Sequence, residues 1–385
     1  MPAIQLKNSG EQMRRTIPVV DLYSQYLSLK TEIDGAISEV IQNSSFIRGP
    51  HVENFETQFA KLVDRKFCLS CANGTDSLFI AMKALGVKPG DEVIAPAHTW
   101  ISTTETITQA GATVVFCDTT EDTFTIEPEE INRKITDKTV GIIPVHLFGQ
   151  AADMEPIMEI AAKKRLWVIE DCAQAHLARY KGRQVGTFGV AASYSFYPGK
   201  NLGAMGDAGA IVTNDKSLDI AMRKYARHGG LIKNQHEVEG INSRMDGMQA
   251  AILNVKIPQL KKWTEKRRKI ASKYDEGLGG TPNIQTPPKQ EGKEHVYHLY
   301  VIKTERRDEL AKHLKSKGIE TIINYPKALP FVQAYSRLGH TIEDFPNAAK
   351  NQDLILSLPM YPELTQEDIE RVIFEIRSFL GNNGN

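Results

Sequence analysis

The chain has 385 residues, of which 41% are hydrophobic and 24% charged, and its 47 basic and 47 acidic residues give a formal net charge of +0. The length exceeds the roughly 100–200 residues of one typical domain, so two domains are expected. The composition excludes wholesale disorder, and the neutral balance argues against nucleic-acid binding. No apolar run reaches the roughly 18 residues needed to cross a bilayer. The N-terminus lacks the apolar core of a signal peptide, so a cytoplasmic protein is expected.

The four cysteines do not form a recognisable metal site. Cys68 and Cys71 make a C-x-x-C pair, but neither Cys117 nor Cys172 supplies a second pair, and no histidines lie at the short spacing that zinc requires. We expect reduced, buried thiols and no metal.

Apolar β-type runs alternate with helix-period segments between about residues 65 and 215. The expected strands are residues 92–96, 113–118, 140–148, 167–171, 191–197 and 208–213. Apolar strands separated by amphipathic helices predict a largely parallel sheet covered on both faces.

Helices are predicted next, at residues 216–227 and over residues 245–278, where Pro258 should kink or break the helix. After a Gly- and Pro-rich turn region, a strand is expected at 296–302, a helix at 308–317 and a strand at 320–324. The pattern therefore predicts an α/β protein with a large domain of residues 1–278 and a smaller α+β domain of residues 279–385. The apolar residues 17–20 could pack against the folded domains.

Lys200 is the first candidate for chemistry, because it follows a strand and a Pro-Gly turn. Gly203, Gly206 and Gly209 come after it and allow close backbone approach or positive φ. A lysine held in a cleft has a lowered pKa and can act as a nucleophile or base. The alternative is an ordinary turn lysine. The glycine spacing precedes a strand, so it differs from the dinucleotide-binding fingerprint, which joins a strand to a helix.

Asp171 ends an expected strand, where α/β sheets place their ligand crevice. A carboxylate there can keep a pyridine nitrogen protonated, although a helix N-cap is the alternative. Gly74 and Thr75 open a helix and offer N–H groups and a hydroxyl to an anion, unless the cap is unoccupied. Ser195 could add a hydroxyl to the same phosphate. Trp100 follows a strand end and could stack on an aromatic cofactor or pack in the core. Together these residues fit pyridoxal 5′-phosphate (PLP).

With these residues assembled, the chain resembles the DegT-type sugar aminotransferase family, within the fold-type I PLP-dependent transferases. The similarity runs from about Ile17 to near the C-terminus. Its landmarks are residues 73–78 (Asn-Gly-Thr-Asp-Ser-Leu), 99–103 (Thr-Trp-Ile-Ser-Thr), 144–150 (Pro-Val-His-Leu-Phe-Gly-Gln), 170–176 (Glu-Asp-Cys-Ala-Gln-Ala-His), 195–203 (Ser-Phe-Tyr-Pro-Gly-Lys-Asn-Leu-Gly) and 240–246 (Gly-Ile-Asn-Ser-Arg-Met-Asp).

The resemblance implies a role for each matching residue. Lys200 would carry PLP as a Schiff base and later move the proton, Asp171 would pair with the pyridine nitrogen, and Trp100 would stack on the ring. The phosphate and ring edge would be held by Gly74, Thr75, Gln174 and Ser195. Asn242 would reach the phosphate of the neighbouring subunit, which implies a homodimer with shared active sites.

The family's activity implies transfer of an amino group from L-glutamate to a keto group of a nucleotide-linked sugar. The product would serve amino-sugar biosynthesis for a surface polysaccharide such as lipopolysaccharide O-antigen, or for a glycosylated metabolite. The form Lys-Asn-Leu-Gly-Ala at 200–204 looks like members that act on 3-keto sugars, whereas 4-keto members more often carry Thr-Thr-Gly-Glu-Gly. Leu177 and Asn324 depart from the family's usual Gly and His, and put the sugar's identity in doubt.

Three alternatives stay open on the sequence: a 4-keto-sugar aminotransferase, a PLP-dependent dehydratase or lyase, and a non-catalytic regulatory protein on the same fold. In the dehydratase branch His replaces the lysine, so Lys200 favours transamination.

Overall fold

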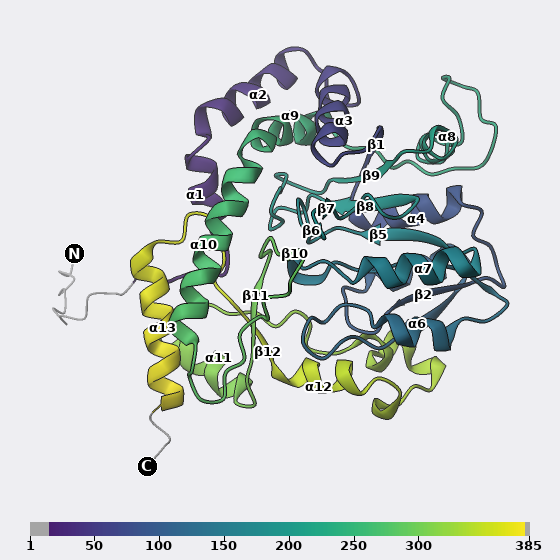
Figure 1. Ribbon diagram of the computed structural model, residues 1–385. Helices are drawn as coiled ribbons and strands as arrows, with labels where there is room; N and C mark the ends of the chain where they lie inside the picture. The colour runs from purple at the N-terminus through teal and green to yellow at the C-terminus, as the bar shows by residue number, and fades with distance from the viewer. Residues whose placement is uncertain (1–14, 382–385) are drawn as a thin grey trace, which may run out of the picture.

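A seven-stranded sheet forms the centre of the larger part of the computed structural model, which describes residues 15–381 (Figure 1). The strand order is β1 (Phe67–Cys71), β9 (Gly209–Thr213), β8 (Ala191–Ser195), β5 (Trp167–Asp171), β4 (Thr139–Ile142), β2 (Glu92–Pro96) and β3 (Thr113–Cys117). Strand β9 pairs antiparallel with both neighbours, and the other pairs are parallel. The predicted α/β fold with a mostly parallel sheet is confirmed.

Helices cover both faces of this sheet, because successive strand residues point to opposite sides. In β2, Ile94 joins one buried core while Val93 and Ala95 join the other. The first core is covered by α3 (Pro50–Leu62), α6 (Pro128–Lys134), α7 (Met154–Lys164) and α9 (Gly247–Lys256). The second is covered by α4 (Gly74–Ala84), α5 (Ser102–Gln109), α8 (Lys216–Tyr225) and α12 (Pro346–Leu354).

A third core lies beside the sheet, in the part of Figure 1 that contains α10, α11 and α13. It is built by α10 (Leu260–Leu278), α11 (Arg307–Ser316), α13 (Gln366–Gly381) and the antiparallel pair β11 (Tyr300–Lys303) and β12 (Ile355–Leu358). Ile17 belongs to this core too, and its N–H donates to the carbonyl of Gly318 at 2.8 Å. The division into residues 1–278 and 279–385 stays a prediction, since α10 and Ile17 share a core with the C-terminal elements.

The remaining elements are short or lie at the periphery. They are α1 (Leu22–Leu27), α2 (Lys30–Gln42), the strands β6 (Arg179–Tyr180), β7 (Arg183–Gln184) and β10 (Lys293–Glu294), and 3-10 turns at Leu147–Gly149, Ile257–Gln259, Leu329–Phe331, Gln333–Leu338 and Ile342–Asp344. The turn at Ile257–Gln259 contains Pro258 and separates α9 from α10, so the predicted break in the long helix is confirmed.

Three predicted strands differ from the structure. The strand expected at 140–148 ends at Ile142, and the chain reaches a 3-10 turn at Leu147–Gly149. Residues 320–324 form no strand: Ile322 makes a single bridge to Ser357, after which the chain turns toward the large sheet and brings Tyr325 against His98. The strand expected at 296–302 begins only at Tyr300, because the N–H groups of Val296 and Leu299 donate instead to the carbonyls of Gly149 and Phe148. The last two departures place residues from the C-terminal part of the chain against the segments that follow β2 and β4.

Candidate active site

Lys200 lies half-buried in a tight turn that follows β8. Its backbone N–H donates to the carbonyl of Tyr197 at 2.8 Å, which closes the turn. A Cβ on Gly203 would lie 2.1 Å from the carbonyl oxygen of Pro198, so the turn needs a glycine for close backbone approach. Burial lowers the pKa of the Lys200 amine to about 8, although the charge of Asp171 opposes the shift. Among residues 15–381, no side chain hydrogen-bonds this amine.

Asp171 is the last residue of β5, and its side chain is buried beside Lys200. Its Oδ2 accepts a hydrogen bond from the hydroxyl of Thr103 at 2.9 Å, and its Oδ1 accepts one from the N–H of Ala173 at 3.1 Å. Burial raises the pKa of the carboxyl group, while these two donors and the charge of Lys200 oppose the rise. The site thus combines an amine of lowered pKa with a buried carboxylate.

The start of α4 lies against the end of β8 and has the features of an anion site. We call its residues Gly74, Thr75, Ser102 and Ser195 the phosphate corner. The Asn73 side chain caps the helix by accepting from the N–H of Asp76 at 2.8 Å, which leaves the N–H groups of Gly74 and Thr75 pointing out of the first turn. A Cβ on Gly74 would lie 2.7 Å from the Cβ of Ser195, so these two residues are in direct contact. The Thr75 hydroxyl lies 2.7 Å from that of Ser102. Free N–H groups, hydroxyls and the helix dipole suit a phosphate here.

An aromatic pair lies on the other side of the site. Trp100 is 57% exposed, and its ring centroid lies 5.4 Å from that of Tyr325 in a tilted arrangement. Tyr325 lies in the segment between α11 and α12, and its hydroxyl accepts from Nε2 of Gln174 at 2.9 Å. Oε1 of Gln174 accepts from the N–H of Phe148 at 2.7 Å. The segment that follows α11 therefore contributes a side chain to the site.

Asn242 does not join this group. It is exposed and bridges only to Arg227, while the neighbouring Ser243 donates its hydroxyl to Asp76 of α4 at 2.6 Å. The segment before it, which follows α8 and projects at the upper right of Figure 1, exposes Ile232 and Val238.

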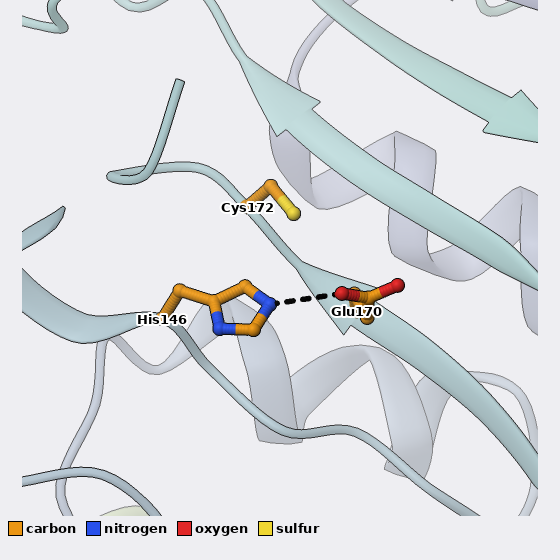
Figure 2. A group of neighbouring side chains, drawn as sticks. All are labelled: His146, Glu170 and Cys172. Carbon is orange, nitrogen blue, oxygen red and sulfur yellow. Dashed lines mark hydrogen bonds and ion pairs between the residues drawn. The ribbon is translucent and has the colours of Figure 1, made fainter. Parts of the chain in front are cut away.

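Behind the site, His146, Glu170 and Cys172 bring three possible metal-ligand atoms within 4.8 Å of one another (Figure 2). Nδ1 of His146 accepts from the N–H of Ala152 at 3.0 Å, so Nε2 carries the proton and donates to Glu170 at 3.1 Å. Burial also keeps the pKa of the Cys172 thiol well above its ordinary value. These bonds use the lone pairs that a metal ion would need.

Glu170 is instead the centre of a structural network. Its carboxylate accepts from the N–H groups of Gly186, Phe188 and Gly189 at 2.7–2.8 Å, and Arg65 lies 4.0 Å away. Burial opposes its ionisation, but these donors and His146 hold its pKa below the ordinary value. The network fixes the end of β5, where Asp171 stands.

The residues present suit PLP on chemical grounds. The buried carboxylate of Asp171 has an N–H or O–H donor on each oxygen but no hydrogen-bonded cation within the described chain, so a pyridinium N–H would supply the missing positive partner. When bound, PLP provides an electron sink for carbanion chemistry. This chain would hold PLP through Lys200, Asp171 and the phosphate corner.

The sequence pointed to these residues because each follows a strand, but it did not identify Thr103, Ser102 or Tyr325 as site residues. Thr103 and Ser102 carried a recoverable signal, since both stand within one helical turn of Trp100. Tyr325 had none, because it approaches from a segment 151 residues away from Gln174.

Strand ends that gather a lysine, a carboxylate and a phosphate corner on a sheet with one antiparallel strand define a fold-type I PLP-dependent transferase. The chain belongs to the DegT/DnrJ/EryC1/StrS aminotransferase family, whose model matches residues 27–377. It is therefore a PLP-dependent aminotransferase, as the motifs predicted.

Several known proteins are similar over nearly the whole chain. A "Pleiotropic regulatory protein" of Geobacillus stearothermophilus is 46% identical over 94% of this chain and 98% of its own. A UDP-N-acetyl-3-dehydro-α-D-glucosamine 3-aminotransferase of Acidithiobacillus ferrooxidans is 40% identical over 94% of this chain and 98% of its own. The crystal structure of DesV from S. venezuelae in complex with a ketimine intermediate superimposes with a TM-score of 0.93, at 39% identity, over 95% of this chain and 99% of that one.

Within residues 15–381, no helix combines the length and the apolar character needed to cross a membrane.

Proposed function

We propose that this enzyme transfers an amino group from L-glutamate to the C3 keto group of a nucleotide-linked sugar, in amino-sugar biosynthesis. One observation carries the choice of C3: relatives whose names give different nucleotides are all named for a sugar with an amino or keto group at C3. The Acidithiobacillus relative is named for a UDP-linked 3-dehydro sugar. Three more relatives, 39–40% identical, are named for 3-amino or 3-oxo sugars, two linked to dTDP and one to UDP. The Lys-Asn-Leu-Gly-Ala form at residues 200–204 supports the same position.

Each site residue takes a role in this proposal that its surroundings support. Lys200 would hold the cofactor covalently and, as a free amine of lowered pKa, would move a proton as a base. Asp171 would hold the proton on the pyridine nitrogen, and Trp100 would cover the ring. Gly74, Thr75 and Ser195 bind the phosphate, while Gln174, tied to Tyr325, lies at the ring edge.

The working form in this proposal is a homodimer whose two active sites share residues. Exposed large apolar side chains support it, because Phe46, Ile47, Tyr197 and Ile232 are each 47–63% exposed and Trp100 is 57% exposed. Asn242, which directly follows the projecting segment, would reach the partner's phosphate. The proposal places the enzyme in the cytoplasm, which its four unpaired, buried cysteines support.

The test is turnover of purified enzyme with PLP against a panel of UDP-, dTDP- and GDP-linked 3-keto and 4-keto sugars, each with L-glutamate. We expect 2-oxoglutarate and a 3-amino sugar from at least one 3-keto substrate, and no product from Lys200→Ala. Amination at C4 alone would overturn the choice of carbon. Loss of water or ammonia from the sugar would indicate a lyase, and cofactor binding without any turnover would indicate a regulatory protein.

A further inference from the structure

We propose that Thr103 is a positioning residue for the cofactor: its hydroxyl fixes the Asp171 carboxylate so that the carboxylate pairs with the pyridine nitrogen without taking its proton. The proposal rests on the assignment of Asp171 as the cofactor's partner. It concerns a residue that is 1% exposed and acts on the cofactor through Asp171.

The geometry is well defined on both sides of the bond. Thr103 is 1% exposed and Asp171 is 5% exposed, so water does not compete for the 2.9 Å hydrogen bond between Oγ1 and Oδ2. The hydroxyl hydrogen must point at the carboxylate, because a carboxylate oxygen only accepts. The Thr99 hydroxyl lies 3.3 Å from that of Thr103 and can donate to its free lone pairs, which strengthens the bond to Asp171.

The carboxylate has one fixed donor on each oxygen, Thr103 on Oδ2 and the Ala173 N–H on Oδ1. An ionised carboxylate offers about four lone-pair positions, so two remain for a cofactor N–H. The two protein donors also prevent the group from rotating about its Cβ–Cγ bond. The carboxylate thus presents its free lone pairs in one direction.

The charge state follows from the same contacts. Burial raises the proton affinity of Asp171, while the Thr103 hydroxyl, the Ala173 N–H and the positive charge of Lys200 lower it. His146 also lowers it, Tyr325 and Cys172 are the further titratable groups that interact with this carboxylate, and Glu170 points into its own network behind the strand. Removing the Thr103 hydroxyl removes one of few opposing contributions, so the proton shared with the pyridine nitrogen shifts toward the carboxylate.

The placement of Thr103 couples this effect to the rest of the site. It stands in the first turn of α5, three residues after Trp100 and directly after Ser102. The Ser102 hydroxyl lies 2.7 Å from that of Thr75 at the phosphate corner. One helical turn therefore contacts the stacking residue, the phosphate corner and the pyridine partner, and holds the three in a fixed relation.

The test compares Thr103→Val and Thr103→Ser with a matched control, Thr104→Val. Thr104 is the next residue of α5, equally buried, and its hydroxyl bonds to Tyr335 instead of the site. Two readouts are taken besides activity: the dissociation constant of PLP from the refilled apoenzyme, and the ¹⁵N chemical shift of ring-labelled PLP in the holoenzyme. The shift reports directly whether the pyridine nitrogen is protonated.

We expect Thr103→Val to weaken PLP binding about tenfold, as loss of one hydrogen bond to a charged group predicts, and to move the ¹⁵N shift toward that of a neutral pyridine. Thr103→Ser should restore both readouts, and Thr104→Val should change neither. If Thr103→Val does not fold, Thr103→Ala takes its place, since Ala and Ser differ only by the hydroxyl oxygen.

A ¹⁵N shift that is the same in wild type and Thr103→Val, or one that Thr104→Val moves as far, would overturn this proposal while leaving the proposed function intact. Wild-type protein that binds no PLP would instead reject the cofactor assignment on which both proposals depend.

Discussion

The lowered pKa of Lys200 leads to a quantitative prediction about how the cofactor-free protein captures PLP. Only the neutral amine attacks the aldehyde. A pKa of about 8 in place of 10.5 corresponds to roughly 3 kcal/mol of discrimination against the charged form. At pH 7 about one in ten molecules then carries a neutral Lys200, compared with about one in three thousand for an ordinary lysine.

The assay mixes apoenzyme with PLP across a pH series, reduces the product with borohydride and locates the label by peptide mapping. We expect the rate at limiting PLP to rise about tenfold per pH unit below pH 8 and to level off above it. In Asp171→Asn the midpoint should fall, because the charge of Asp171 raises the pKa of Lys200. Lys200→Ala is the control and should incorporate no label.

Two results would refute this reasoning. A rate that keeps rising toward pH 10.5 would show that burial does not lower the pKa of Lys200. Label on a different lysine would remove Lys200 from the chemistry altogether. Lys256 makes the second outcome a real test, because burial lowers the pKa of that amine to about 8 as well.

Three further predictions concern stability and assembly. Glu170→Gln should lower the free energy of unfolding at pH 7 by about 3 kcal/mol in denaturant titrations, because it leaves the buried Arg65 without its charge partner. The pKa of Glu170 is lower in the folded than in the unfolded protein, so its contribution to stability is present above the unfolded-state pKa. That contribution is lost as the pH falls through the folded-state pKa, and the Gln variant should not show this loss of stability in acid. Gly74→Ala should destabilise the protein by about 1–3 kcal/mol in thermal unfolding and weaken PLP binding, because its Cβ would overlap a neighbouring side chain. Mixing Lys200→Ala with Asn242→Ala subunits should restore about a quarter of wild-type activity. Half of the dimers are then mixed, and each mixed dimer contains one intact shared site out of two. No recovery of activity after confirmed subunit exchange would count against shared sites.

The sequence was sufficient for the sheet and for the residues that directly follow its strands. Lys200, Asp171 and Gly74 each carry a local signal, a Pro-Gly turn, a strand-ending carboxylate and a helix start. Parallel strands then bring these separate positions to one edge, so the assembly follows from topology. The break at Pro258 was predictable for the same reason, since it depends on one residue's own geometry.

The rest depends on contacts between distant segments. The hydrogen bond from Thr103 to Asp171 joins residues 68 positions apart, and no local sequence pattern at either residue predicts the contact. The strand predicted at 320–324 was wrong because its alternating residues lack a partner strand along their length, and the chain instead turns to insert Tyr325 near Gln174. Periodicity describes the faces of a segment but not which neighbour it meets.

The position of Ile17 has a consequence for how the protein is made. This residue is synthesised before the large sheet, yet its core also contains Val372 and Ile376 of α13. At about 5–20 residues per second, a ribosome needs roughly 20–70 s to translate the intervening chain. During that interval the two cores on the faces of the large sheet can form, while Ile17 does not yet have its contacts with α13. Helix α13 therefore completes a core to which Ile17, about 350 residues earlier in the chain, also belongs.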